Sequence, residues 1–127
     1  MKIALLINQK NMEKYSNKSD LRSSWELIHL GNGDVADSDI IATDAEVVVA
    51  DAVNPVSAAV INAMPQLKLI HSQGVAYNLI DCQAAKEKGV FVCNNAAVNA
   101  GAVAEHAIML MLVLLRRFTE SQIQVRA

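Results

Sequence analysis

The chain has few of the residues that mark specialised classes of protein. Its two cysteines, Cys82 and Cys93, form no CxxC pattern and have no paired histidine spacing, so neither a disulfide framework nor a zinc site is predicted. The longest unbroken apolar run, residues 107–115, is far shorter than the ~20 residues of a membrane span. Residues 1–7 do not resemble a signal peptide. We therefore expect free thiols, a cytoplasmic location and no membrane segment.

The chain also lacks a large excess of positive or negative charge. The 127 residues contain 11 Lys and Arg against 13 Asp and Glu, a net charge of −2. Both signs are scattered, and the largest basic cluster is Arg116-Arg117, which argues against an electrostatic nucleic-acid surface. Because 53% of the residues are hydrophobic and 19% are charged, a single folded globular domain is expected.

Five short segments have the composition of buried strands, and helical segments separate them. The strands are expected at residues 2–7, 25–30, 46–50, 67–70 and 90–93. Strands that alternate with helices over this length predict a parallel sheet with right-handed crossovers. The fold class is therefore α/β, a flavodoxin-like, doubly wound, five-stranded parallel sheet.

The helical segments carry their own start and stop signals. A helix over residues 56–64 is expected to have Pro55 in its first turn. Asp81 is expected to cap the helix that Gly89 ends. A long apolar helix begins near residue 100. Residues 1–100 are thus expected to form the flavodoxin-like domain, and residues 101–127 to form a long helix.

One segment, GNGDVA at residues 31–36, fits the glycine pattern of a dinucleotide-binding loop, and Asp51 follows at a suitable distance. Phosphate binding at such a loop depends on the positive end of a helix. Here acidic residues at 34, 37 and 39 crowd that position, and the helix has room for few residues. An ordinary glycine turn is the preferred interpretation.

A second segment, HSQGVAYNLID at residues 71–81, follows the fourth predicted strand. Ligands of open parallel sheets bind beyond the carboxyl ends of the strands. Small residues at Gly74 and Ala76 leave successive backbone N–H groups uncovered, an arrangement suited to an anion. The spacing alone also fits a turn that merely connects strand to helix.

The run from Leu67 to Arg117 resembles the substrate-binding domain of the D-isomer-specific 2-hydroxyacid dehydrogenases. Three parts carry the resemblance: LKLI followed by GV and ID, the segment AAKEKGVFVCN, and VNAGAVAEH opening a helix that ends in LLRR. The resemblance is weaker over residues 1–66, where only the order of elements agrees. It implies an enzyme that oxidises or reduces a small 2-hydroxy or 2-keto acid with NAD or NADP.

The resemblance also implies roles for particular residues. Main-chain amides of Val75 and Ala76 would hold the substrate carboxylate, and Gly74 would let it approach. Val103 matches a family position that touches the nicotinamide. The glycine-rich NAD motif and the catalytic arginine, glutamate and histidine of the family would follow Arg117, so no catalytic residue is assigned here. We expect this chain alone to be inactive and to bind no cofactor tightly.

Several positions depart from the family pattern. Ala96-Ala97 replaces the usual Pro-Gly, Gly101 stands where an acidic residue is common, and Asn78 replaces an aspartate. Ala76 replaces the second glycine of the carboxylate loop. Residues 51–54 offer no arginine, so a phosphate-bearing substrate is not expected and a small unphosphorylated acid fits better.

The last predicted helix is apolar on nearly every face, and such a helix must be covered. An alternative function is therefore a non-catalytic, free-standing domain that forms a homodimer or binds a partner through residues 101–118. Glu105 and His106 are adjacent, so on a helix they diverge by about 100° and cannot form a proton relay. We expect both to be packing or interface residues, His71 to be structural, and His29 to be structural or exposed.

Overall fold

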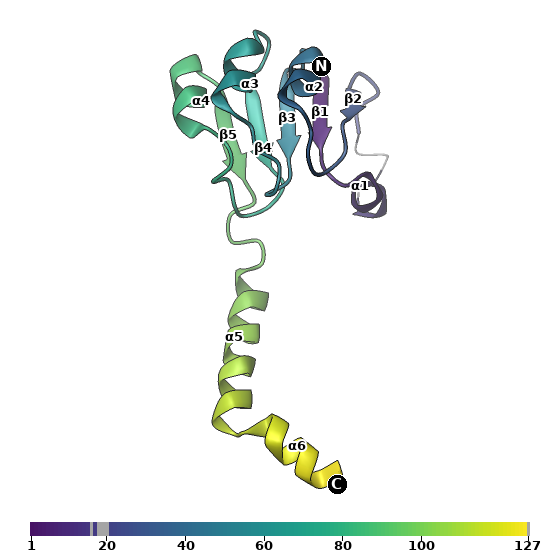
Figure 1. Cartoon of the computed structure of the whole chain (residues 1–127). Coiled ribbons are helices and arrows are strands. Elements are labelled where there is room, and N and C mark those ends of the chain that lie inside the picture. Colours follow the sequence, from purple (N-terminus) through teal and green to yellow (C-terminus); the bar gives the residue numbers. More distant parts are fainter. Residues whose placement is uncertain (16, 18–20, 127) are drawn as a thin grey trace. The chain divides into compact units, whose positions relative to one another are not determined.

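The computed structural model describes residues 1–15, 17 and 21–126, and the chain divides into two units, Met1–Ala96 and Ala97–Ala127. The first unit contains the sheet and four helices, and the second contains two helices (Figure 1). The end of the polar connection predicted after the first strand, residues 16 and 18–20, lies outside the described residues.

The first unit is built on a five-stranded sheet in which every neighbouring pair is parallel. Its order, β2-β1-β3-β4-β5, is that of flavodoxin-like folds, so the predicted fold class is confirmed. The strands are β1 (Lys2–Leu6), β2 (Glu26–His29), β3 (Val47–Ala50), β4 (Leu69–Ser72) and β5 (Phe91–Asn94).

Three helices lie side by side over one face of the sheet (Figure 1): α2 (Asp37–Ala42), α3 (Ala58–Ala63) and α4 (Cys82–Lys88). The main core lies beneath them, where Val48 and Ile70 from the strands pack with Ile40, Ile61 and Ala85 from the helices, all fully buried. The apolar stripe of each short helix is therefore covered by the sheet.

The other face of the sheet is covered only in part by the described residues. Ile3 and Leu5 form a second cluster with Met12 of α1 (Gln9–Tyr15) and with Trp25. Towards β5 this cover ends, and Phe91 is 76% exposed. Side chains of β4 and β5 on this face therefore reach solvent.

Two predicted element starts are wrong. Pro55 does not lie in the first turn of α3. Val56 pairs with Ile80 in an isolated parallel bridge, and the helix begins later, with Ser57 as its N-cap. The Ser57 hydroxyl accepts a hydrogen bond from the Val60 amide. Strand β4 begins and ends two residues later than the predicted 67–70. Its register with β3 draws His71 and Ser72 into the strand.

The second unit corrects the prediction of one long helix to the end of the chain. Helix α5 (Ala100–Leu115) ends before Arg117, which has a φ of 48°, and α6 (Phe118–Arg126) follows. A left-handed backbone at a residue other than glycine cannot continue a helix. No residue of α5 is buried. None of the helices in the described residues is both long and apolar enough to cross a bilayer.

Helix α4 has both predicted ends. The Asp81 carboxylate accepts a hydrogen bond of 2.9 Å from the Ala84 amide, and Gly89 adopts the left-handed conformation at the C-terminus with a φ of 74°. The last residue of α4, Lys88, also caps a different helix. Its ammonium donates to the carbonyl oxygens at the end of α3, those of Ile61, of Asn62 at 3.0 Å and of Met64 at 2.8 Å.

We predict that Lys88→Met destabilises the first unit. The substitution leaves α3 carbonyl oxygens without a donor and removes a cation from the negative end of that helix. A loss of about 1–3 kcal/mol in the free energy of unfolding is expected from charge-assisted hydrogen bonds, measured by urea denaturation. Lys86→Met on the exposed side of α4 is the control and should change stability little. Equal effects of the two substitutions would contradict the capping role.

Candidate functional site

The loop of Gln73–Ala76 follows β4 at the edge of the sheet where all five strands end. In Figure 1 the arrowheads of the strands mark this edge. Ser72, the last residue of β4, is buried, whereas Val75 is 40% exposed. The loop therefore rises from a fixed strand end into solvent, where ligands of open parallel sheets bind.

Two asparagines at the end of β5, Asn94 and Asn95, hold the loop by its carbonyl oxygens. The Asn94 side chain donates to the Val75 oxygen at 2.6 Å, and the Asn95 side chain donates to the Gln73 oxygen at 2.7 Å. The Asn95 backbone amide donates to the Gly74 oxygen at 3.0 Å. The parallel register pairs Ser72 with Asn94, which explains why these donors lie beside the loop.

A fourth carbonyl oxygen of the loop is held from the other side. The hydroxyl of Ser72 donates to the Ala76 oxygen at 2.5 Å. Ser72 is only 1% exposed, so this donor is itself fixed by its packing. Every carbonyl from Gln73 to Ala76 thus has a donor.

The backbone amides that follow Gln73 in the same loop, unlike the loop's carbonyl oxygens, have no hydrogen-bond partner among the described residues. None of the N–H groups of Gly74, Val75 and Ala76 donates to another residue in the described part of the chain. In a trans peptide the N–H points away from the carbonyl oxygen of the preceding residue. Because the carbonyls of Gln73, Gly74 and Val75 are held by the protein, the three following N–H groups are turned away from those contacts.

Gly74 is not required by the backbone or by the packing. Its φ lies outside the left-handed region, and a Cβ added there would lie 3.7 Å from the Ala52 Cβ, an ordinary contact. The same Cβ would lie 3.9 Å from the Ala76 nitrogen. A side chain at position 74 would therefore fit the fold and partly cover one of the open amides.

The charge next to this loop is negative. Asp51 follows β3, and its carboxylate accepts hydrogen bonds from the Ala52 amide at 2.7 Å and from the Asn32 side chain at 2.9 Å. These donors offset part of the charge. No basic residue stands in residues 51–54, as the sequence indicated, so the anion-binding capacity of this edge rests on neutral amides.

The GNGDVA segment forms a turn. Gly31 and Gly33 have φ values of 90° and 123°, which favour glycine, and the Asn54 side chain donates to the Gly33 oxygen at 2.7 Å. The helix that follows, α2, has six residues and carries Asp37 and Asp39 in its first turn. These carboxylates oppose a phosphate at the helix N-terminus.

The remaining sequence candidates are dispersed. His29 is exposed on the edge strand β2. His71 pairs in register with Cys93, and its Nδ1 lies 3.1 Å from the cysteine Sγ, a contact that the sequence analysis missed. Both cysteines are free and exposed. No cluster of three or more histidine, cysteine or acidic side chains suited to a metal ion is present among the described residues.

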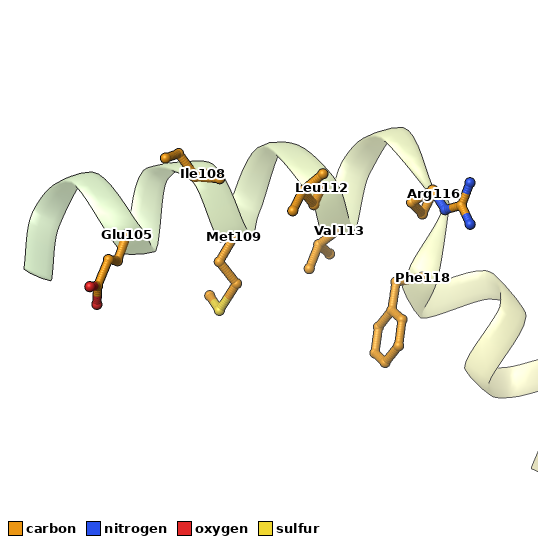
Figure 2. A pocket seen from close by; sticks show the side chains of 7 residues that line it. All are labelled: Glu105, Ile108, Met109, Leu112, Val113, Arg116 and Phe118. Carbon is orange, nitrogen blue, oxygen red and sulfur yellow. The ribbon is translucent and has the colours of Figure 1, made fainter.

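The second unit presents an apolar groove of about 550 Å³ along α5 and the start of α6. Figure 2 shows Glu105, Met109, Val113 and Phe118 on one side of the ribbon. The groove is lined by Glu105, Ile108, Met109, Leu112, Val113, Arg116 and Phe118, and His106 is not among these residues. Val103, the proposed nicotinamide contact, lies in the first turn of α5 and is 57% exposed.

Comparison with known proteins gives relatives of one family. Hydroxypyruvate reductase of Thermotoga maritima is 35% identical over 86 residues, which are 68% of this chain and 28% of that protein. D-3-phosphoglycerate dehydrogenase of Mycobacterium leprae is 33% identical over 84 residues, 66% of this chain and 16% of that protein. The chain therefore spans less than a third of the length of these two relatives.

Among solved structures, NAD-dependent formate dehydrogenase from Staphylococcus aureus in complex with NAD superposes with a TM-score of 0.74 at 27% identity. The match covers 98% of this chain and 40% of that one. The family model of the D-isomer specific 2-hydroxyacid dehydrogenase catalytic domain matches residues 8–126. The order of strands and these matches agree, and the chain belongs to the D-isomer specific 2-hydroxyacid dehydrogenase family.

Proposed function

We propose that this chain supplies the substrate-binding part of an NAD(P)-dependent oxidoreductase that acts on a small 2-hydroxy or 2-keto acid. The amides of Val75 and Ala76 would donate to the substrate carboxylate, and Gly74 would allow its close approach. The observation that carries this proposal is the loop in which four successive carbonyl oxygens are engaged while the amides are not. Such a loop suits an anion and not a cation.

The expected strength of this binding is modest. Hydrogen bonds to a charged group contribute about 1.5–3 kcal/mol each, so two give roughly 3–6 kcal/mol. That range corresponds to dissociation constants from about 40 μM to about 6 mM. The entropy cost of association weakens the binding further, so a value on the order of millimolar is expected. Tight binding and catalysis would require further groups, which in the family are an arginine, a glutamate, a histidine and the nicotinamide.

A substrate without a phosphate group fits this edge of the sheet better than one with it. A phosphate carries more negative charge than a carboxylate, and the nearby charged group is Asp51 rather than an arginine. The chain is also related to a D-3-phosphoglycerate dehydrogenase, but residues 51–54, in the neighbouring loop after β3, contain no cation for a phosphate. Small acids resembling lactate, pyruvate or glyoxylate are therefore the preferred class.

The cofactor of the whole enzyme would be NAD or NADP, which supplies or accepts the hydride. In this chain Val103 is the residue expected to contact the nicotinamide, through an apolar side chain that is exposed in the first turn of α5. We assign to no described residue the transfer of a proton to or from the substrate hydroxyl. The chain on its own is proposed to bind the carboxylate and to leave the chemistry to other residues of the family enzyme.

A second candidate function is association through residues 101–118 without catalysis. The observation that favours it is the exposure of large apolar side chains around α5, for example Met111 at 60% and Leu114 at 77%. Exposed apolar surface of this extent is typical of a surface that another protein or a second copy covers. This candidate shares the fold with the first and differs in what the chain binds.

The carboxylate site is tested by titrating the ¹⁵N-labelled chain with oxalate, a stable mimic of a 2-keto acid. We expect the amide resonances of Val75 and Ala76 to shift with a dissociation constant on the order of millimolar. Gly74→Ala should abolish these shifts and leave the unfolding midpoint unchanged, because its Cβ meets only ordinary contacts and lies near the Ala76 amide. Gly101→Ala, in α5, is the matched control and should bind oxalate normally.

The same titration separates the substrate classes. D-lactate and pyruvate should shift the same amides as oxalate, and 3-phosphoglycerate should bind no more tightly than they do. Stronger binding of 3-phosphoglycerate would overturn the assignment to unphosphorylated acids. Shifts confined to residues outside 73–77 would overturn the site itself.

The dinucleotide interpretation of GNGDVA is tested by titrating the chain with NADH and following the nicotinamide fluorescence. We expect no saturation at micromolar concentration, since Asp37 and Asp39 lie in the first turn of the short helix α2. Micromolar binding that Gly33→Val removes would instead make the first unit a nucleotide-binding module.

Association through α5 is tested by sedimentation velocity of the same chain. A homodimer or larger species is expected, because the apolar side chains of α5 are exposed. Leu112→Glu in the groove should shift the population towards monomer, whereas Gln122→Glu on α6 should not. A chain that is monomeric at all concentrations would contradict the second candidate.

A further inference from the structure

A thiol and an imidazole lie next to each other on the partly uncovered face of the sheet. His71 on β4 and Cys93 on β5 are partners in the parallel register, so their side chains leave the same face. The distance from His71 Nδ1 to Cys93 Sγ is 3.1 Å, within reach of a hydrogen bond that involves sulfur. The pair takes no part in the proposed carboxylate site.

We propose that Cys93 is a reactive thiol that forms mixed disulfides with small disulfides, with His71 as the group that positions and accepts the thiol proton. The nucleophile in such exchange is the thiolate, and a free thiol at neutral pH is only a few per cent ionised. A nitrogen base within hydrogen-bond distance can accept the thiol proton as the sulfur attacks. Exposure of Cys93 gives the reagent access.

The reaction balances with a small disulfide as the only co-reactant. The thiol proton passes to His71 Nδ1, and the Cys93 sulfur attacks one sulfur of the disulfide. A new S–S bond forms as the old one breaks, and the departing thiolate takes the proton from the imidazolium. Cys93 is thereby oxidised to a mixed disulfide, and half of the reagent is released as a reduced thiol.

The structure provides room for the attached group. A cavity of about 250 Å³ is lined by Cys93 together with Tyr77, Cys82, Val92 and Asn94. Because Cys93 on the edge strand is also exposed, a small organic thiol can remain bonded to Sγ without displacing the core.

The second cysteine offers an internal comparison. Cys82 lines the same cavity and is also exposed, but it begins the seven-residue helix α4 directly after the capping carboxylate of Asp81. Only Cys93 has an imidazole nitrogen at hydrogen-bond distance among the described contacts.

The test is the rate of modification at each cysteine of the intact 127-residue chain. The chain is mixed with glutathione disulfide, quenched at intervals and digested, and the adduct at each cysteine is quantified by mass spectrometry. We expect Cys93 to react about tenfold or more faster than Cys82. Cys93 has a base within hydrogen-bond distance of its sulfur, and Cys82 has none among the described contacts. Equal rates, or faster reaction at Cys82, would overturn the proposal.

The role of His71 is tested by His71→Asn, in which a neutral amide replaces the base. The rate at Cys93 should fall about tenfold, while the rate at Cys82 in the same molecules stays unchanged. That ratio distinguishes loss of the base from a general disturbance of the fold, which would change both rates. An unchanged rate at Cys93 in the His71→Asn chain would show that the imidazole is not the activating group.

One consequence rests on the proposed function. Asn94 lies next to Cys93 in the chain and holds the Val75 carbonyl, so an adduct beside Asn94 is expected to weaken oxalate binding by several-fold. Unaltered oxalate affinity in the modified chain would show that modification of Cys93 does not affect the loop at residues 73–76. If the unmodified chain fails to bind oxalate, the carboxylate assignment is wrong, and the cysteine rates still decide the thiol proposal.

Discussion

The candidate site depends on one constraint, the orientation of the peptide planes in the loop after β4. The carbonyls of Gly74 and Val75 are fixed by donors from Asn95 and Asn94, and a planar trans peptide then turns the next two N–H groups the opposite way. In the proposed site, the protein therefore builds an anion-binding surface without a charged side chain. It does so by satisfying the acceptors of the loop and leaving its donors open. Any change that releases the carbonyls also releases the amides, so the two asparagines at the end of β5 are as much part of the candidate site as the loop itself.

That constraint depends in turn on the parallel sheet. Because β4 and β5 run in the same direction and Ser72 pairs with Asn94, both strands end together and their following residues meet. An antiparallel neighbour would have placed the start of a strand at this edge. The buried core beneath α3 and α4 holds the two strands in register, and Lys88 ties the end of α3 to α4. The position of the amides is thus set by packing on the helical face, far from any ligand.

Local signals were readable in the sequence, whereas contacts between strands were not. Asp81 and Gly89 act within one helical turn, and both were predicted as the structure shows them. Pro55 was misplaced, because the bridge from Val56 to Ile80 joins segments far apart in the chain. The helix breaks at Arg117, where no glycine or proline in the sequence predicts a break. The order of elements and the loop at residues 74–76 could be predicted, but the Asn94 contact and the His71–Cys93 pair follow from register between β4 and β5, which no local pattern specifies.

If the proposed carboxylate site is made of neutral amides, the class of substrate depends on the surroundings of the loop. Amides supply directed donors but little net charge, so they do not by themselves distinguish a carboxylate from a phosphate. The distinction comes from neighbouring charges, and here the neighbour is Asp51, whose two hydrogen bonds offset only part of its charge. Each additional negative charge on a ligand is therefore opposed at this edge. A relative with the same backbone and a cation after β3 would favour a phosphate-bearing substrate over a simple carboxylate. The loop after β4 would need no change.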